Sequence, residues 1–499
     1  MSSTFASLKF FNYRLWFGAN IVASSAMWMQ RVAQDWVVLT VLTNGSGTAL
    51  GIVTALQFIP TLLFSPWAGL IADRMNLRRV VQLCQSLNGI MSLILGILIL
   101  TNTAQLWHVY ALAFISGIIG TIDSPARQTF VSELVPLKFL PNAVGLNSAA
   151  FNVARLIGPA ISGLVIEWVG PGWVFVVNFL LFFGPVIGIL LMRLGELHEI
   201  EHVPHEKHQI RKGFRYVRKR TDIVVIMIVA GIVSAFGMNF QMTSAVMATD
   251  VFGKGAGEYG ILGSFMAVGA LIGALLAARR KYPRVRLVVI AAVLFGMFNI
   301  LLGVAPTYAT FAILAVPTGL AMLTMVTAAN AAIQVSTDPQ MRGRVMSLYL
   351  MVYLGANPIG APIIGWIADV AGGRWALIAG GLISIVVAVI CGLWAVHSWD
   401  VRVKARFSRH PIIMYGPRER AEDRRRRLEE EKARKQKEAQ EQQAESQQQA
   451  EENGQPQSED AGQRRSEENG QRRSEENRQP QSEETEEQLD AESDRVDEP

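Results

Sequence analysis

Long apolar runs fill the first four-fifths of this sequence and restrict what the chain can fold into. An α-helix needs about 20 apolar residues to cross the roughly 30 Å hydrocarbon core of a membrane. Twelve runs of about this length occur, at residues 13–42, 50–72, 80–100, 107–130, 142–169, 173–191, 223–249, 259–278, 287–304, 308–335, 345–370 and 375–396. Since an open strand cannot satisfy its backbone hydrogen bonds in lipid, each run is predicted to be a helix. We therefore predict an all-α membrane protein with twelve transmembrane helices, in preference to a large soluble helical protein.

Charge separates the chain into an apolar body and a polar tail. Only 17% of all residues are charged, compared with about 25% in an average soluble protein. Residues 1–399 hold 26 Lys and Arg against 14 Asp and Glu, whereas residues 400–499 hold 20 against 27. The tail, 399–499, is predicted to be mostly disordered, with a solvent-exposed helix favoured over 418–450. Its repeats alternate in charge and lack aromatic residues, which argues against nucleic-acid binding.

The basic residues predict how the helices are oriented. With the N-terminus in the cytoplasm, the connections on the cytoplasmic side hold 21 Lys and Arg, and the outer connections hold only Lys254 and Arg374. Cytoplasmic loops of membrane proteins carry such an excess of positive charge. No cleavable signal pattern occurs in residues 1–12. We predict a multi-pass protein of the cell membrane, embedded in its lipid bilayer, with both termini in the cytoplasm.

The longest connection divides the apolar body into two halves. It spans residues 194–222 and separates six predicted helices from the next six. The predicted organisation is therefore a bundle over 1–193, a cytoplasmic central loop, and a second bundle over 223–398. Two such halves are typical of transporters whose substrate site lies between them.

A weak internal repeat supports the two halves. The sequence PAISGLVIEWVG at 159–170 matches APIIGWIADVAG at 361–372, in the fifth and eleventh predicted helices. The alignment pairs Gly163 with Gly365, Glu167 with Asp369 and Gly170 with Gly372. Repeats at equivalent places in both halves favour the transporter interpretation.

The connection between the second and third runs carries an unusual motif. It reads Gly69-x3-Asp73-x2-Asn76-x-Arg78-Arg79. This spacing resembles the signature of the major facilitator superfamily, G-x3-D-x2-G-x-R/K-R/K, with Asn76 at the position of the second glycine. Asparagine tolerates the left-handed backbone region, so we expect the tight turn to survive. Gly69 is expected to let another helix approach closely.

The resemblance implies that this connection is a latch between the halves on the cytoplasmic side. Asp73 is expected to meet the positive N-terminal end of helix eleven, near 343–345. Arg74 and Arg78 are expected to bridge to acids on neighbouring helices, with Glu133 as the candidate. A plain positively charged loop is the alternative, and it explains the arginines but neither Gly69 nor Asp73.

Three further stretches resemble one branch of this superfamily. They are residues 28–51, 123–148 and 336–349, and the likeness covers 10–398. The branch includes enterobactin exporters and macrolide efflux proteins. The resemblance implies a monomeric exporter of lipophilic or amphipathic small molecules, driven by proton entry. The chain contains no G-x4-G-K-[ST] motif for ATP.

Polar residues inside the first run are candidates for transport, because ionisable groups within a membrane helix cost several kcal/mol. Five of them recur every three or four residues and form one stripe, namely Asn20, Ser24, Trp28, Arg31 and Asp35. We predict that the stripe lines the substrate cavity. Asp35 is the candidate proton carrier, with Arg31 facing it one turn away. The alternatives are a self-neutralised pair and an Asp35 solvated at the outer surface.

Other candidates lie in later runs. Arg155 stands alone in the fifth run and is predicted either to bind an anionic substrate group or to pair with an acid across the bundle. Asp123 and Arg127, four residues apart near the cytoplasmic side, are expected to support the latch. Soft or polar cavity candidates in the second half are Met238, Asn239, Gln241, Met242, Thr327 and Asn330. Ordinary packing is the alternative for each of these six.

The leading hypothesis is thus a secondary active transporter that exports drugs or other lipophilic molecules by alternating access. A dedicated siderophore, bile-acid or metabolite exporter of the same fold is the first alternative. A substrate-sensing membrane protein that signals through its tail is the second. No nucleophile–base arrangement, metal cluster or cofactor fingerprint stands out, so we expect no enzyme activity, no metal and no cofactor.

Overall fold

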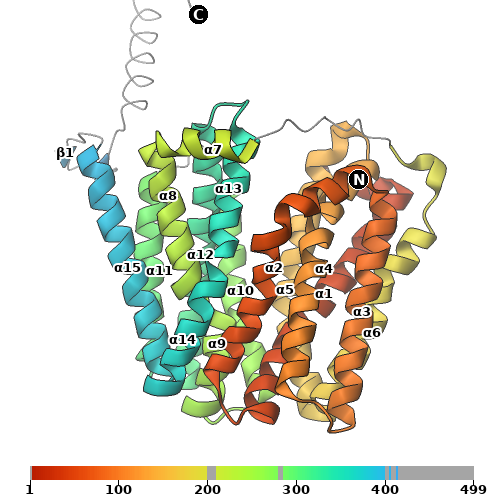
Figure 1. Cartoon of the computed structure of the whole chain (residues 1–499), viewed down its shortest axis with the longest axis horizontal. Helices are drawn as coiled ribbons and strands as arrows, with labels where there is room; N and C mark the ends of the chain where they lie inside the picture. The colour runs from red at the N-terminus through yellow and green to blue at the C-terminus, as the bar shows by residue number, and fades with distance from the viewer. Residues whose placement is uncertain (1–2, 199–208, 279–284, 399–403, 406–411, 414–499) are drawn as a thin grey trace, which may run out of the picture. The chain divides into compact units, whose positions relative to one another are not determined.

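The computed structural model describes residues 3–198, 209–278, 285–398, 404–405 and 412–413, with the side chains of 3–4, 66–74, 209–213, 278, 398, 404–405 and 412–413 left undescribed (Figure 1). The described chain is almost wholly helical. Its α-helices are α1 Phe11–Trp36, α2 Gly47–Arg74, α3 Leu77–Leu100, α4 Leu106–Glu133, α5 Leu140–Val169, α6 Pro171–Leu190, α7 Gln209–Arg218, α8 Thr221–Ile232, α9 Phe240–Val246, α10 Ala256–Ala278, α11 Val285–Gly303, α12 Tyr308–Ser336, α13 Arg342–Gly355, α14 Asn357–Ala371 and α15 Gly373–Ser398. Short 3-10 turns are η1 Ser3–Lys9, η3 Leu137–Phe139 and η4 Leu194–Glu196, and π-helical turns are η2 Val37–Leu42, η5 Val233–Gly237 and η6 Met247–Val251. Two-residue strands β1 Lys404–Ala405 and β2 Ile412–Ile413 pair antiparallel.

Eleven stretches of the described residues are long and apolar enough to cross a membrane. They match eleven of the twelve predicted runs and define a multi-pass membrane protein. The run at 13–42 does not meet the same hydropathy, because its helix α1 carries Arg14, Arg31 and Asp35. Helix α1 nevertheless packs along α5 and α6, and η2 continues it as a π-helical turn.

Two of the predicted helices are broken. The run at 223–249 comprises α8, η5, α9 and η6, with a break at Met238 and Asn239. The run at 345–370 comprises α13 and α14, which meet at Ala356 just before Pro358. Proline lacks the N–H that a continuous helix needs, which accounts for the second break. The first break follows Gly237, whose missing side chain leaves room for Phe295 and Ser384.

Helix packing follows two patterns. In the first half of the chain, α1 packs on α5 and α6, α3 on α4 and α6, and α2 on α4. In the second half, α10 packs on α12, and α11 on α12 and α15. Two long contacts join these groups, one between α2 and α14 and one between α5 and α10 (Figure 1).

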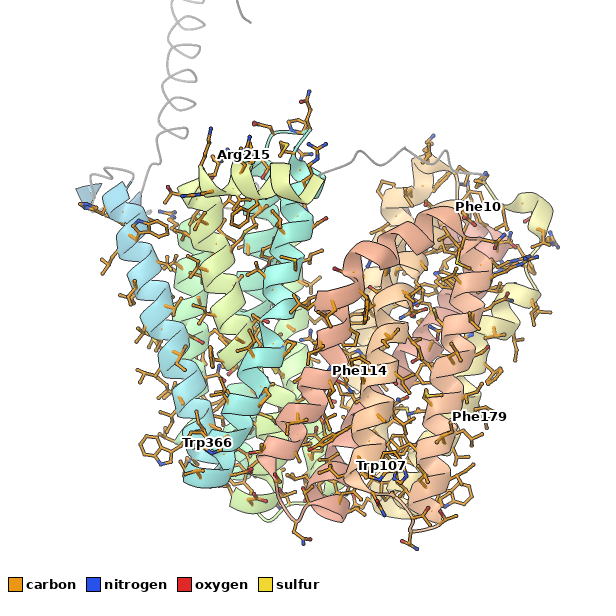
Figure 2. The ribbon with its side chains drawn as sticks, in the orientation of Figure 1. Phe10, Trp107, Phe114, Phe179, Arg215 and Trp366 are labelled. Carbon is orange, nitrogen blue, oxygen red and sulfur yellow. The ribbon has the colours of Figure 1, made fainter. Side chains whose placement is uncertain are left out.

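The two ends of the helices differ in composition. We call the end that holds α7, the α2–α3 connection and residues 134–139 the basic face, and the end that holds residues 43–46, 101–105 and 252–255 the opposite face. Arg215 lies at the basic face, and Trp107 and Trp366 lie toward the opposite face (Figure 2). Exposed tryptophans at the opposite face are Trp107, Trp168, Trp173, Trp366 and Trp375. Tryptophan gathers at membrane–water interfaces, so these rings indicate where the hydrocarbon core ends.

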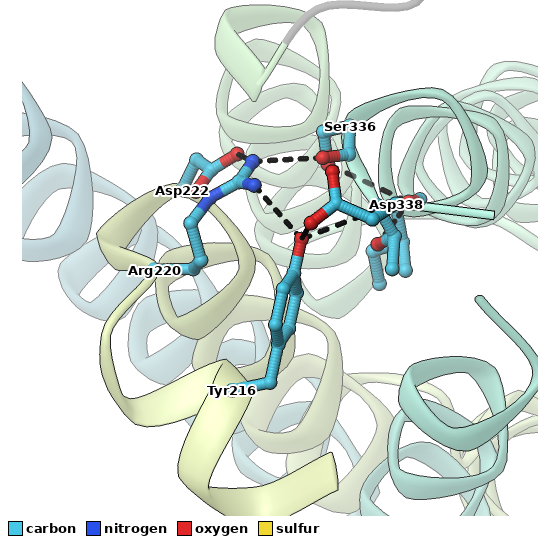
Figure 3. Close-up of polar contacts among 7 residues, drawn as sticks. Tyr216, Arg220, Asp222, Ser336 and Asp338 are labelled. Carbon is cyan, nitrogen blue, oxygen red and sulfur yellow. Dashed lines mark hydrogen bonds and ion pairs between the residues drawn. The ribbon is translucent and has the colours of Figure 1, made fainter. Parts of the chain in front are cut away.

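A polar cluster fixes α7 to the second half at the basic face (Figure 3). The Tyr216 hydroxyl donates to Asp338 Oδ2 at 3.1 Å, and Arg220 donates through Nη2 to the carbonyl of Ser336 at 2.9 Å. Arg220 also pairs with Asp222, with Nη2 and Oδ2 2.6 Å apart. This hydrogen bond raises the pKa of the Arg220 guanidinium above its ordinary value. The described end of the central connection is therefore anchored to α8 and α12.

The connection at Asn76 is as short as expected, between Arg74 and Leu77, but the left-handed conformation invoked for Asn76 is wrong. Its φ of −63° is not left-handed, and it serves as the N-cap of α3. The Asn76 side-chain oxygen accepts the Arg79 N–H at 3.3 Å. Asparagine is among the preferred N-cap residues because its oxygen satisfies an amide that the helix leaves unpaired. Asparagine thus suits this position through capping.

Candidate functional site

A buried carboxylate joins the two halves near the end of α1. Asp35 is 6% exposed, and the hydroxyl of Tyr259 in α10 donates to Asp35 Oδ2 at 3.2 Å. The Gln241 carbonyl lies 3.4 Å from the same hydroxyl as an alternative acceptor. The Trp36 ring stacks on Tyr259, with centroids 6.3 Å apart. Asp35 is therefore enclosed by protein, which contradicts the alternative that it is solvated at the outer surface.

Arg31 is close to this carboxylate without binding it directly. Arg31 is near enough for its positive charge to interact electrostatically with both Asp35 and Tyr259. The guanidinium itself lies over the Phe58 ring of α2, 5.6 Å from its centroid. Among the ion pairs of the described residues, none joins Arg31 to Asp35. The expected face-to-face pair is thus replaced by a longer-range interaction, and the hydrogen-bond partner of Asp35 is Tyr259.

The rest of the predicted stripe on α1 has several environments. Asn20 accepts a hydrogen bond from Arg127 Nη1 at 3.1 Å. Ser24 is buried, 2% exposed. The Trp28 ring meets Phe151 of α5 edge-on at 5.9 Å, and its Nε1 is buried without a hydrogen-bond partner among the described residues. The stripe therefore faces α4 at one end and α5 and α10 at the other.

Asp123 and Arg127 belong to a buried polar network within the first half. Their side chains pair at 2.9 Å, and Gln85 of α3 donates to both Asp123 oxygens at 3.0 Å. Arg127 extends the network to Asn20. Sequence reasoning singled out neither Gln85 nor the link to α1, because nothing in the spacing shows which helices meet. The network ties α1, α3 and α4 together.

The latch stays a prediction. The surroundings of Gly69 and the side chains of Asp73 and Arg74 lie outside what the structure describes. Arg78 and Arg79 are on the first turn of α3, where Arg78 is partly buried and Arg79 is exposed. Glu133 ends α4, and its carbonyl accepts the His198 N–H at 2.9 Å.

Arg155 lies midway along α5 and between the halves. Its electrostatic neighbour is Tyr353 of α13 in the second half. The Tyr353 hydroxyl donates to the Met238 sulfur at 3.4 Å, and the Tyr349 ring stacks on Tyr353 at 5.8 Å. Among the ion pairs of the described residues, none includes Arg155. The predicted pairing with an acid across the bundle is therefore not what this part of the structure contains.

The cavity candidates of the second half separate into two groups. Met238 and Asn239 lie at the helix break, where the Asn239 amide donates to the Ala235 carbonyl at 2.7 Å. Gln241 follows the break, and its Oε1 is buried without a partner among the described residues. Met238 contacts the Tyr353 hydroxyl, and the Gln241 carbonyl lies near the Tyr259 hydroxyl.

The remaining candidates sit in packed helices. Met242 is 3% exposed within the apolar core. Thr327 donates to the Leu323 carbonyl of its own helix at 2.7 Å. Asn330 is partly buried on α12. Helical packing is thus the observed environment of Met242 and Thr327.

Two acids join the two halves at the opposite face. Asp369, at the end of α14, accepts the N–H groups of Gly47 and Thr48 and the Ser46 hydroxyl, the last two at 3.0 and 3.1 Å. Glu167, at the end of α5, has its carboxylate against Gly257 in the first turn of α10. An acid is favourable at a helix N-terminus, where the backbone dipole is positive. Each half therefore contributes one acid to a helix start in the other half.

Close backbone contact accompanies both acids. A Cβ built on Gly365 would lie 2.2 Å from the Gly47 carbonyl oxygen, and one built on Gly163 would lie 2.4 Å from the Ala256 carbonyl oxygen. Only glycine permits such an approach. We call these contacts, α14 on α2 and α5 on α10, the two joints. They use the residues that the internal repeat aligns, and they close the halves at the opposite face.

Solved structures share this fold. A bacterial homologue of the human lysosomal transporter Spinster, inward-facing and unoccupied, matches with a TM-score of 0.61 at 15% identity, over 77% of this chain and 96% of that one. A POT family transporter in complex with a thioalcohol-conjugated peptide matches with a TM-score of 0.63 at 14% identity, over 77% and 95%. The fold is that of a major facilitator transporter.

Curated relatives are similar in sequence over most of their length. The Staphyloferrin A transporter of Staphylococcus aureus is 25% identical over 72% of this chain and 90% of its own. Macrolide efflux protein A of Streptococcus pyogenes is 23% identical over 77% and 95%. The multidrug efflux pump Tap of Mycobacterium tuberculosis is 24% identical over 71% and 86%. The family described as transmembrane secretion effector matches residues 2–416, and the chain belongs to this family of major facilitator superfamily transporters. The recognition made from sequence is confirmed, and the protein is a transporter and not an enzyme.

Proposed function

We propose that the protein exports lipophilic or amphipathic small molecules in exchange for protons. Two six-helix halves, residues 1–193 and 223–398, alternate access to a site between them, with 194–222 as their link. Its family and the efflux proteins among its relatives support this function. The observation that carries the proton coupling is the buried Asp35 carboxylate, whose hydrogen-bond donor Tyr259 belongs to the other half.

The proposed location is the cell membrane, with the basic face and both termini in the cytoplasm. The excess of basic residues in the connections at that face supports this orientation. The exposed tryptophans at the opposite face then mark the outer interface. The two joints close the outer side, so the described conformation is the one in which cargo would enter from the cytoplasm.

The bond between Asp35 and Tyr259 supplies a physical link from movement to proton exchange. A carboxylate inside a membrane protein needs either a donor or a proton, because its unpaired charge is costly there. Separation of the halves at the opposite face would remove Tyr259 and admit water to Asp35. Asp35 then takes up a proton outside and releases it after the joints close, with Arg31 favouring the charged form. Protonation is thereby tied to which side is open.

The connection 69–79 is proposed to close the cytoplasmic side in the alternate state. Asp73 would then meet the start of α13 near 343–345, which begins at Arg342. The paired Asp123 and Arg127 hold α4 against α3 and α1, which gives the latch a rigid base.

The decisive experiment replaces Asp35 by asparagine. Energised everted vesicles, whose cytoplasmic face is outside, should accumulate a fluorescent drug from the medium with the native chain and lose this export activity when a protonophore is added. Asp35→Asn should abolish protonophore-sensitive export. The amide keeps the shape of the side chain and an oxygen acceptor for Tyr259, but it neither takes up nor releases a proton. Glu196→Gln, which alters an exposed pair with Arg193, is the matched control and should export normally. Unchanged protonophore-sensitive export by Asp35→Asn would refute the assignment.

A dedicated exporter of one metabolite is the second candidate function. The Staphyloferrin A transporter among the relatives favours it, as does Arg155, which has no ion pair among the described residues. A susceptibility panel across unrelated drugs distinguishes the two. Protection against many drugs supports multidrug export, whereas an effect confined to one metabolite supports the dedicated exporter.

A further inference from the structure

The central arginine Arg155 has no counter-charge in the described part of the molecule. Arg127 and Arg220 pair with Asp123 and Asp222 at 2.9 and 2.6 Å, and Arg31 has the Asp35 carboxylate one turn away. Among the described residues, Tyr353 is the titratable group that interacts with Arg155, and its neutral phenol supplies no counter-charge. An ionised group at the centre of a membrane helix costs about 2.5–3.5 kcal/mol on insertion scales. A positive charge retained there without an acid calls for an anion from outside the chain.

Donor groups and aromatic rings gather on the same face of α5. Phe151, Arg155 and Gly158 are spaced four and three residues apart, which places them on one side of the helix. Trp28 covers this side, since its ring meets Phe151 at 5.9 Å and a Cβ built on Gly158 would lie 2.8 Å from Trp28 Cβ. Trp28 Nε1 is a buried N–H without an acceptor in the described structure. Helical spacing places Arg155 on the side of α5 that Trp28 covers.

The second half adds hydroxyl groups to this region. Among the described residues, the Tyr353 hydroxyl donates to the Met238 sulfur, a weak acceptor that a stronger one can replace. The hydroxyl of Tyr349, stacked on Tyr353, is buried without a partner among the described residues. The region therefore holds donors of three kinds, a guanidinium, an indole N–H and phenols, between aromatic walls. Such a set complements a negatively charged oxygen attached to an apolar body.

We propose that Arg155, Trp28 and Tyr353 form an anion subsite that binds the carboxylate of an amphipathic substrate. The inference rests on the proposed exporter function and names its substrate class, which is organic acids with an apolar or aromatic body. Arg155 binds the carboxylate, Trp28 and Tyr353 donate to its remaining lone pairs, and the apolar body lies against the rings. Because Arg155 and Tyr353 come from different halves, the bound anion bridges them.

Binding by the purified full-length protein tests the subsite without requiring transport. The probes are a fluorescent aromatic carboxylate and its methyl ester, which share a body and differ in charge. The native chain should bind the carboxylate about tenfold or more tightly than the ester, since hydrogen bonds to a charged group are the strong ones. Arg155→Gln should remove this preference, and Arg155→Lys should retain part of it.

Further variants keep the test decisive if Arg155→Gln does not fold. Tyr353→Phe and Trp28→Phe keep the rings and remove one donor each, so each should weaken carboxylate binding about threefold to tenfold and leave ester binding within about twofold. Arg215→Gln alters an exposed arginine on α7 and should change neither affinity.

Several results would overturn the subsite. They are equal affinity of the native chain for carboxylate and ester, equal loss of both in the variants, or an anion preference that chloride alone satisfies at millimolar concentration. Vesicle export with and without a protonophore separates this inference from the proposed function. Charge-selective binding without proton-driven export would leave the subsite standing and reject the proton coupling.

Discussion

Asp369→Asn should release one of the two joints at the opposite face. The Asp369 carboxylate accepts two N–H groups from the first turn of α2 and the Ser46 hydroxyl. Hydrogen bonds to a charged group contribute about 1.5–3 kcal/mol, and neutral ones about 1 kcal/mol. Asparagine keeps one neutral acceptor, so we expect a loss of about 1–2 kcal/mol from the closed state. That loss shifts the equilibrium toward opening at this face by about 5- to 30-fold.

Labelling of a cysteine introduced by Thr54→Cys measures this shift. Thr54 is 7% exposed on α2, so a cysteine there should react slowly with a membrane-impermeant maleimide while the joint is closed. The native Cys84 and Cys391 are both buried and are replaced by alanine in the background. Asp369→Asn should raise the labelling rate of Thr54→Cys about 5- to 30-fold.

Two comparisons decide whether the reasoning holds. Glu167→Gln weakens the other joint and should raise labelling in the same direction, because the carboxylate lies at the start of α10. Lys254→Gln alters an exposed charge at the same face whose ion-pair partner, Glu258, belongs to the same half, and it should have no effect. An unchanged rate in Asp369→Asn, or an equal rise in Lys254→Gln, would refute the role assigned to Asp369.

Other perturbations have equally definite outcomes. Gly365→Ala should block the close approach to Gly47 and reduce vesicle export strongly, whereas Gly120→Ala, where nothing lies within 4 Å, should not. Arg127→Gln leaves the buried Asp123 without its cation and should lower stability by on the order of 3 kcal/mol, read as a lower melting temperature of the purified protein; an unchanged melting temperature would contradict the network. Removal of residues 415–499 should leave drug export unchanged, because the matched family region ends at 416; loss of export would favour a function for the tail.

The positions of the helices are readable from sequence because lipid imposes them. A spanning segment must satisfy its backbone internally and be long enough, so the predicted run 173–191 differs little from α6, Pro171–Leu190. The break within 223–249 was not readable, since a π-helical turn changes neither length nor hydropathy. The run 13–42 is harder to identify as a membrane-spanning helix by hydropathy, because the polar residues that suggest its function lower that value.

The candidate site was only partly readable. Spacing identified Asp35 and Arg155 as unusual, because charged residues inside apolar runs stand out. It did not identify Tyr259 or Tyr353, which look like ordinary aromatic residues until the packing of distant helices brings them to those charges. The repeat aligned Glu167 with Asp369 but did not predict their use, since a helix start far away in sequence is the partner of each.

The partnership between Asp369 and α2 also concerns how the chain is made. Ser46 satisfies the Ala49 and Leu50 amides at the start of α2, whereas the amides of Gly47 and Thr48 depend on a carboxylate up to 322 residues downstream. During cotranslational insertion, the amides of Gly47 and Thr48 at the start of α2 therefore lack their acceptor until the eleventh predicted helix emerges from the ribosome. A nascent chain that stops before residue 369 exposes the start of α2, which gives membrane quality control a local signal of an incomplete protein.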